Sequence, residues 1–211
     1  RALDAKVQQR RRTEQDLRVA LLEGGLRVHY QPVIDIATGR TTAYEALVRW
    51  DHPERGMLPP DEFLAIAEET GLIVPLGEFV IRQALTEMAS WKGNFRLSIN
   101  LSPSQIRSVD LLPTIADALA ATGFDASRIE FEITEHVILQ ADSSATATLD
   151  RLRASGIKIA LDDFGTGYSS LSYLRRFPFD RIKIDRSFVK DLTSSTSSRA
   201  IVSTGIALGR S

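Results

Sequence analysis

The chain has 211 residues, of which 43% are hydrophobic and 25% charged, with 26 Lys and Arg against 27 Asp and Glu. This composition is typical of a folded globular protein that is long enough to bury a core of its own. The nearly balanced charge creates no general field that would favour binding to a nucleic-acid polymer, so we expect none as a partner. The sequence contains no cysteine, which excludes disulfides, zinc–thiolate sites and cysteine nucleophiles.

The N-terminal stretch is expected to form a charged helix. Leu17, Ala20 and Leu21 recur at helical spacing, and Gly24 with Gly25 marks a stop. We therefore predict a helical linker over residues 1–25, following an upstream region, and a single domain over residues 26–211. No apolar run approaches the roughly 18 residues that span a bilayer. We expect a cytoplasmic domain, which a larger membrane-attached protein could also carry.

From Leu26 onward, strand-like and helix-like patterns alternate, which predicts parallel β/α units. The strand-like segments are Arg27–Ile36, Thr41–Trp50, Phe95–Leu101, Arg128–Thr134, Ile157–Asp162 and Arg181–Asp185. The helix-like segments are Asp61–Glu69, Leu76–Trp91, Leu111–Ala121, Ser143–Ser155 and Ser169–Arg175. The first two strands lie too close together for a parallel crossover, which favours a hairpin. The Ser/Thr-rich segment 193–198 is expected to be a loop.

Polar side chains follow a common pattern along these strands. In the segment 129–133 the glutamates alternate with apolar residues, so they point to the opposite face. A single strand with one wet face would look the same. Several such strands, with polar groups towards their C-terminal ends, are typical of a β/α barrel, which builds its active site there. We therefore expect these residues to converge at one rim: Glu45, Asn100, Glu132, Asp162, Asp163 and Asp185.

Such a group of carboxylates needs protons or cations, because two like charges 4 Å apart cost about 4 kcal/mol at an effective dielectric near 20. Oxygen ligands with one amide suit Mg²⁺ or Mn²⁺ rather than zinc or copper. The adjacent Asp162 and Asp163 could let one carboxylate bridge two ions, an arrangement suited to phosphoester hydrolysis. Lys183 could position the attacking water, and Arg49 could bind a phosphate. The pattern predicts a phosphodiesterase.

The sequence also resembles a known family, the EAL domains. Residues 44–50 contain the Glu-Ala-Leu signature, and family-like motifs occur in order across the chain from about Leu26 to its end. They are Tyr30-Gln31-Pro32-Val33, Asn100-Leu101-Ser102-Pro103, Glu132-Ile133-Thr134-Glu135, the segment 162–171, and Ile182-Lys183-Ile184-Asp185. The resemblance implies an α/β fold, a modified TIM (β/α)₈ barrel with an antiparallel first strand. It also implies hydrolysis of cyclic di-GMP to linear 5′-pGpG with two Mg²⁺ or Mn²⁺ ions.

The resemblance also implies roles for individual residues. Metal ligands would be Glu45, Asn100, Glu132 and Asp162 for one ion, and Asp162 and Asp163 for the other. Lys183 would contact the nucleophilic water, with Asp185 close to the second ion. The substrate-binding residues would be Gln31, Leu47, Arg49 and Asn100. Glu135 would order the loop Phe164–Leu171, which in the family links metal binding to a homodimer interface.

Three further expectations follow from the resemblance. In the family, two more strands follow a helix like the segment 197–208, and the first of them carries another glutamate ligand. The printed sequence ends before them, so we expect a C-terminally incomplete barrel. The N-terminal helix resembles the connector after a GGDEF domain, so an upstream GGDEF or sensory domain is a candidate partner. The alternatives to catalysis are a non-catalytic cyclic di-GMP receptor and a purely dimerising or regulatory domain.

Overall fold

The computed structural model describes residues 2–139, 142–167 and 179–209. Its strands are β1 (Leu26–Ile34), β2 (Thr41–His52), β3 (Gly56–Leu58), β4 (Arg96–Asn100), β5 (Ile129–Thr134), β6 (Lys158–Phe164) and β7 (Arg181–Ile184). Its α-helices are α1 (Ala2–Glu23), α2 (Leu64–Thr70), α3 (Ile73–Ser90), α4 (Pro103–Arg107), α5 (Leu111–Thr122), α6 (Glu135–Leu139), α7 (Ser143–Ala154), α9 (Arg186–Lys190) and α10 (Thr196–Leu208). Short 3₁₀ helices cover Pro60–Glu62 and Ala126–Arg128.

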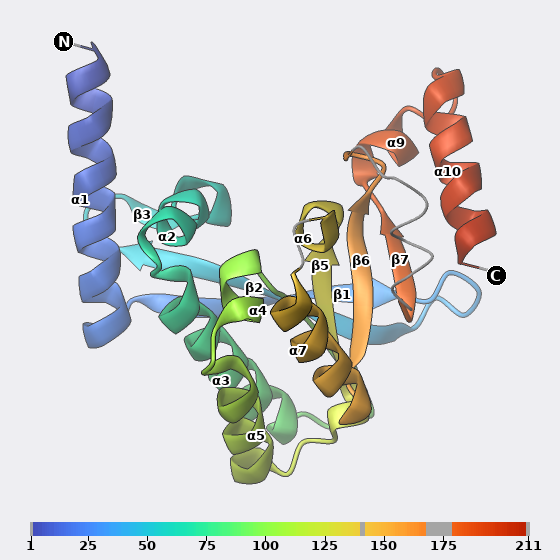
Figure 1. The fold of residues 1–211 in the computed structure, drawn as a ribbon, viewed down its shortest axis with the longest axis horizontal. Helices are drawn as coiled ribbons and strands as arrows, with labels where there is room; N and C mark the ends of the chain where they lie inside the picture. The colour runs from blue at the N-terminus through green and yellow to red at the C-terminus, as the bar shows by residue number, and fades with distance from the viewer. Residues whose placement is uncertain (1, 140–141, 168–178, 210–211) are drawn as a thin grey trace.

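The strands form one curved sheet in the order β1-β2-β4-β5-β6-β7, with β3 paired to β2 (Figure 1). β1 and β3 run antiparallel to β2, and the remaining neighbours are parallel. The predicted hairpin between the first two strands is therefore confirmed. Its turn is held by the Asp35 carboxylate, which accepts hydrogen bonds from the Thr38 amide at 2.8 Å and hydroxyl at 2.7 Å. Gly39 supplies the left-handed backbone that the turn needs, at φ 68°.

The two faces of the sheet differ in chemistry. One face carries the apolar core, in which Leu97, Ile129 and Phe131 are at most 1% exposed. Helices α3, α5 and α7 lie outside the sheet (Figure 1) and contribute buried side chains to the same core. Burying each such side chain contributes about 1.5–3 kcal/mol, so this packing fixes which way every strand faces. The alternate residues, including Glu130 and Glu132, therefore point to the inner face.

Helix α1 packs on the domain through its C-terminal half. Leu17 is fully buried and Ala20 is 8% exposed, while Asp16 Oδ2 lies 3.2 Å from His52 Nε2 on β2. α1 runs along the edge of the molecule beside β3 and α2 (Figure 1). The predicted N-terminal helix is therefore confirmed. It is held against the rest of the chain by an apolar contact and by polar pairs.

The observed elements differ from the predicted ones mainly where segments are short. The pattern did not indicate β3, α4, α6 or α9, each of which has five residues or fewer and is too short for a periodic signal. The predicted loop 193–198 is wrong in its second half, because α10 begins at Thr196 with the Ser195 hydroxyl accepting from the Ser198 amide as its N-cap. The helix expected over Ser169–Arg175 lies outside the described residues.

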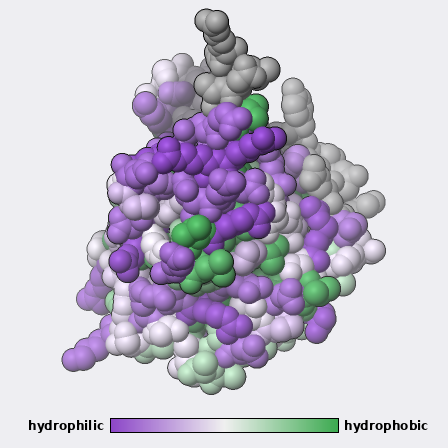
Figure 2. Space-filling model, turned by 90° about the vertical axis from the view of Figure 1, so that its left-hand side faces the viewer, coloured by the Kyte–Doolittle hydropathy of each residue, from purple (hydrophilic) through white to green (hydrophobic). Residues whose placement is uncertain are grey.

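Two further observations concern the hydropathy of the described residues. None of the helices in the described ranges is both long and apolar enough to cross a membrane. The face seen in Figure 2 is predominantly hydrophilic, with apolar side chains gathered only in small groups.

Candidate functional site

The inner face of the sheet brings polar side chains from five strands together around one lysine. Lys183 Nζ on β7 donates hydrogen bonds to Glu45 Oε2 at 3.3 Å, to Asp162 Oδ2 at 3.1 Å and to Glu132. Asn100 Nδ2 on β4 donates to Glu45 Oε1 at 3.0 Å. These five residues, Glu45, Asn100, Glu132, Asp162 and Lys183, are called the lysine cluster below. Every one of them was predicted from the sequence to face this side.

The electrostatics of the lysine cluster follow from burial. Glu132 is 2% exposed, and burial raises the pKa of its carboxyl to about 7, with Lys183 opposing this and Glu45 and Asp162 adding to it. Burial alone lowers the pKa of Lys183, but the carboxylates of Glu132, Asp162 and Glu45 outweigh it and raise that pKa above its ordinary value. The ammonium group of Lys183 thus offsets part of the negative charge of these three carboxylates.

Asp163 and Asp185 occupy different surroundings from the lysine cluster. Asp163 has a left-handed backbone with φ 52°, which is uncommon for a residue other than glycine and is found at functional sites. Burial raises the pKa of its carboxyl, and the charges of Asp162 and Asp185 raise it further. The Asp185 carboxylate accepts a hydrogen bond from the Ser187 amide at 2.9 Å as the N-cap of α9. A hydrogen bond from the Ser187 side chain lowers the pKa of Asp185.

Glu135 fixes the start of the loop that follows β6. Its Oε1 accepts a hydrogen bond from the Gly165 amide at 2.7 Å, and the side chain is 4% exposed. The backbone of Gly167 comes so close that a Cβ there would lie 2.7 Å from Glu135 Oε2. Of the loop predicted at Phe164–Leu171, residues 168–171 lie outside the described residues.

The predicted substrate-binding residues lie on β1 and β2. Gln31 pairs directly with Glu45 across the antiparallel ladder, so both side chains belong to the same face. Leu47 and Arg49 follow Glu45 at alternate positions of β2 and share that face. Arg49 Nη1 donates to the Val48 carbonyl at 2.8 Å. These residues therefore lie on the same inner face as the lysine cluster.

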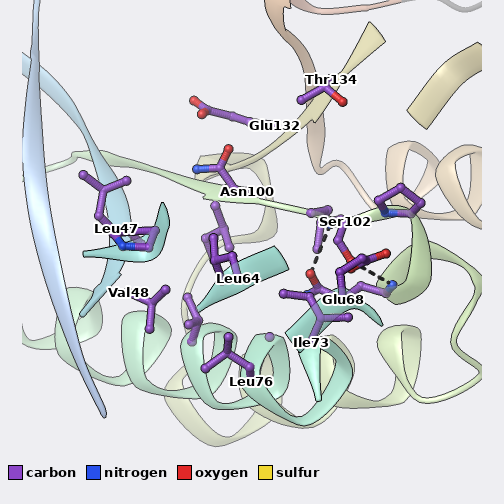
Figure 3. Close-up of a pocket in the computed structure, with 18 of the residues that line it drawn as sticks. Leu47, Val48, Leu64, Glu68, Ile73, Leu76, Asn100, Ser102, Glu132 and Thr134 are labelled. Carbon is purple, nitrogen blue, oxygen red and sulfur yellow. Dashed lines mark hydrogen bonds between the residues drawn. The ribbon is translucent and has the colours of Figure 1, made fainter. Parts of the chain in front are cut away.

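A cavity of about 580 Å³ opens beside the cluster (Figure 3). Leu47, Asn100 and Glu132 line one side of it, and apolar residues of α2 and α3 such as Leu64 and Leu76 line the other. A largely apolar cavity with a few polar groups in its walls is the usual form of a small-molecule site.

Further polar residues in the wall of this cavity were not predicted from the sequence. Glu68 Oε1 accepts hydrogen bonds from the Ser104 amide at 3.2 Å and hydroxyl at 2.6 Å, while its buried Oε2 has no hydrogen-bond partner among the described residues. Ser102 and Gln105 form a capping box at the start of α4. The Ser-Pro-x-Gln pattern of a capping box was visible in the sequence, whereas nothing local indicated that Glu68 faces α4.

The donor set fits a hard divalent cation, because it consists of carboxylate and amide oxygens on neighbouring strands. Within the described ranges, no group of three or more His, Asp or Glu residues has the arrangement that would hold a metal ion. The central position of Lys183 explains this, since its ammonium group draws three carboxylates around itself.

Comparison with known proteins identifies the family. Residues 14–211 match the EAL domain. The chain belongs to the EAL domain family. Protein y4lL of Sinorhizobium fredii is 53% identical over 209 residues, covering 99% of this chain and 25% of that protein. The bifunctional diguanylate cyclase/cyclic di-GMP phosphodiesterase MucR of Pseudomonas aeruginosa is 38% identical over 213 residues, covering 99% of this chain and 31% of that protein. This EAL chain therefore spans about a quarter to a third of the length of these relatives.

Two solved structures extend the comparison. The PaMucR phosphodiesterase in complex with c-di-GMP has a TM-score of 0.88 and 39% identity, covering 94% of this chain and 82% of that chain. A manganese and cyclic di-GMP complex of BlrP1 from Klebsiella pneumoniae has a TM-score of 0.73 and 32% identity, covering 85% of this chain and 45% of that chain. With the antiparallel first strand and the parallel series from β2 through β4, β5 and β6 to β7, these likenesses confirm the predicted modified TIM-barrel fold.

Proposed function

We propose that this EAL domain is a cyclic di-GMP phosphodiesterase that hydrolyses its substrate to linear 5′-pGpG with two Mg²⁺ or Mn²⁺ ions. The observation that carries the proposal is the lysine cluster, in which one ammonium group and three carboxylates from separate strands meet beside a cavity. Relatives named as cyclic di-GMP phosphodiesterases, including MucR, support the choice of substrate.

Four residues would hold the first ion: Glu45, Asn100, Glu132 and Asp162. Asp162 and Asp163 would hold the second, with Asp185 nearby. When bound, the two ions supply Lewis-acid stabilisation of the negative charge on the phosphate. The choice of Mg²⁺ or Mn²⁺ rests on the oxygen donors, and a manganese complex of the related BlrP1 supports it.

The remaining roles belong to the chain's own groups. Water would attack phosphorus, so that a new P–O bond forms and the bond to the 3′ oxygen breaks, with one proton of the water passing to the released 3′ oxygen. Lys183 would orient this water, Arg49 would bind a phosphate through its guanidinium, and Gln31 and Leu47 would contact the guanine base. Glu135 would act as a positioning residue through the Gly165 amide that it holds.

A receptor that binds cyclic di-GMP without hydrolysing it is the second candidate. One observation favours it: Lys183 contacts all three carboxylates and offsets part of their negative charge without a metal ion. We further propose a homodimer through the loop 164–171, an upstream GGDEF or sensory domain, and a cytoplasmic location. We also propose that residues 1–25 form a linker and that the domain begins at residue 26.

The test is chromatography of cyclic di-GMP after incubation with the protein and Mn²⁺. We expect 5′-pGpG from the wild type and a loss of roughly 100-fold or more in Glu45→Gln, which removes one ligand charge while keeping its shape. Glu69→Gln is the matched control, because Glu69 is an exposed glutamate paired with Arg10 on α1. Saturable binding with no product in the wild type would favour the receptor.

A further inference from the structure

A second ion pair, between a buried carboxylate and a partly exposed guanidinium, lies on the inner face of the sheet, one layer below the lysine cluster. Glu130 on β5 is 2% exposed, and its Oε1 lies 3.4 Å from Arg181 Nη1 on β7. Ser98 Oγ on β4 donates to the same oxygen at 3.3 Å. Glu130 precedes Glu132 by two residues, and Arg181 precedes Lys183 by two, so each pair faces the same side.

Both pairs join β5 to β7 across the strand between them. β6 separates the two strands and places Ala160, which is fully buried, opposite both Glu132 and Arg181 in the ladder. An alanine leaves room above β6 for long side chains from either side to meet. Lys158 lies directly opposite Glu130 in the ladder, yet the ion pair of Glu130 is with the more distant Arg181.

β7 needs such an attachment, because its backbone pairing is short. It has four residues, all half-buried, and its register with β6 shifts between Leu161 and Phe164. At its start, the Asp180 carboxylate accepts from the Ile159 amide at 3.0 Å. The position of Lys183 therefore depends on side chains that hold β7 as well as on the sheet.

We propose that Arg181, acting through the buried carboxylate of Glu130, is a positioning residue that holds β7 where Lys183 reaches Glu132. Its effect on turnover rests on the proposed phosphodiesterase function, whereas its effect on the placement of Lys183 does not. Removing Arg181 alone would leave the buried Glu130 carboxylate without its cation, so a single substitution would mix loss of stability with loss of position.

The decisive variant is Glu130→Met with Arg181→Met, which removes both charges and the ion pair together and puts unbranched apolar side chains in their place. The first measurement is the rate of acetylation of Lys183 in the metal-free protein, followed by mass spectrometry. We expect a rise of roughly tenfold over the wild type in the folded double variant, because the hydrogen bonds that protect the amine open more often. In turnover assays we expect kcat to fall roughly 100-fold with KM little changed.

Two comparisons separate positioning from a general structural role. Arg181→Lys keeps a cation for Glu130 and should restore protection of Lys183 in part, while Lys158→Met removes a cation beside Glu130 that does not reach β7 and should change neither measurement. If E130M/R181M does not fold, E130Q/R181Q removes both charges while keeping polar side chains and is measured in the same way. A folded variant with wild-type acetylation of Lys183 would overturn the proposal. An inactive wild type would instead overturn the phosphodiesterase, and acetylation would still decide the role of Arg181.

Discussion

Lys183 contacts three carboxylates that would repel one another without it. In the metal-free protein its ammonium group lies among the carboxylates, where a metal ion would otherwise lie. Among the described contacts it is the only cationic group that touches Glu132, which is 2% exposed. The same side chain is therefore important for stability in the absence of metal and, under the proposed function, for orienting water. Two roles for one residue can be separated by measuring stability without metal and turnover with it.

Lys183→Met should destabilise the metal-free protein by about 2 kcal/mol, since it removes the cation from a largely buried carboxylate group. We expect a smaller loss of stability than for a fully buried ion pair, because the Lys183 side chain is 28% exposed and water partly screens its charge. Urea denaturation in the presence of a chelator measures the effect. Lys190→Met, at an exposed lysine of α9, is the control and should change stability little. Equal stability of K183M and the wild type would contradict the electrostatic role.

At the scale of elements, α1 is bound to the domain by few contacts of different kinds. Leu17 is fully buried and Thr13 is 3% exposed, whereas Leu22 on the same helix is 87% exposed. Exposed ion pairs such as Arg12 with Glu54 accompany the apolar contact but contribute little each. Leu17 is therefore the largest apolar side chain that α1 buries completely against the domain.

Leu17→Ala should lower the free energy of unfolding by about 2–4 kcal/mol, the usual cost of removing a buried leucine side chain. Leu22→Ala makes the same chemical change on the same helix at an exposed site and should stay within about 0.5 kcal/mol of the wild type. Denaturation monitored by Trp50 and Trp91 fluorescence compares the two. Similar losses in both variants would mean that α1 is held in another way.

At the scale of the whole molecule, period-2 alternation predicted which residues face inward, because burial of the opposite face fixes the orientation of each strand. Alternation alone therefore places five residues on one side: Glu45, Asn100, Glu132, Asp162 and Lys183. It could not predict that Glu130 pairs with Arg181, since alternation along one strand does not say which side chains reach across a neighbouring strand. Nor could it indicate Glu68, whose contact with Ser104 depends on how α2 packs on α4.

The whole molecule should also report on metal binding through its melting temperature. A ligand that binds only the folded state at about 100 times its Kd adds about 2.7 kcal/mol to the free energy of unfolding. For a chain of 211 residues this corresponds to a rise of roughly 5–10 °C. We expect Mn²⁺ or Mg²⁺ to produce this rise, excess chelator to reverse it, and Glu45→Gln with Glu132→Gln to abolish it.

Because Lys183 competes for the same carboxylates, the ion must displace its hydrogen bonds, so acetylation of Lys183 should speed up as metal binds. A melting curve that neither metal nor chelator moves would contradict a divalent site in this cluster and leave the metal-free receptor as the better account.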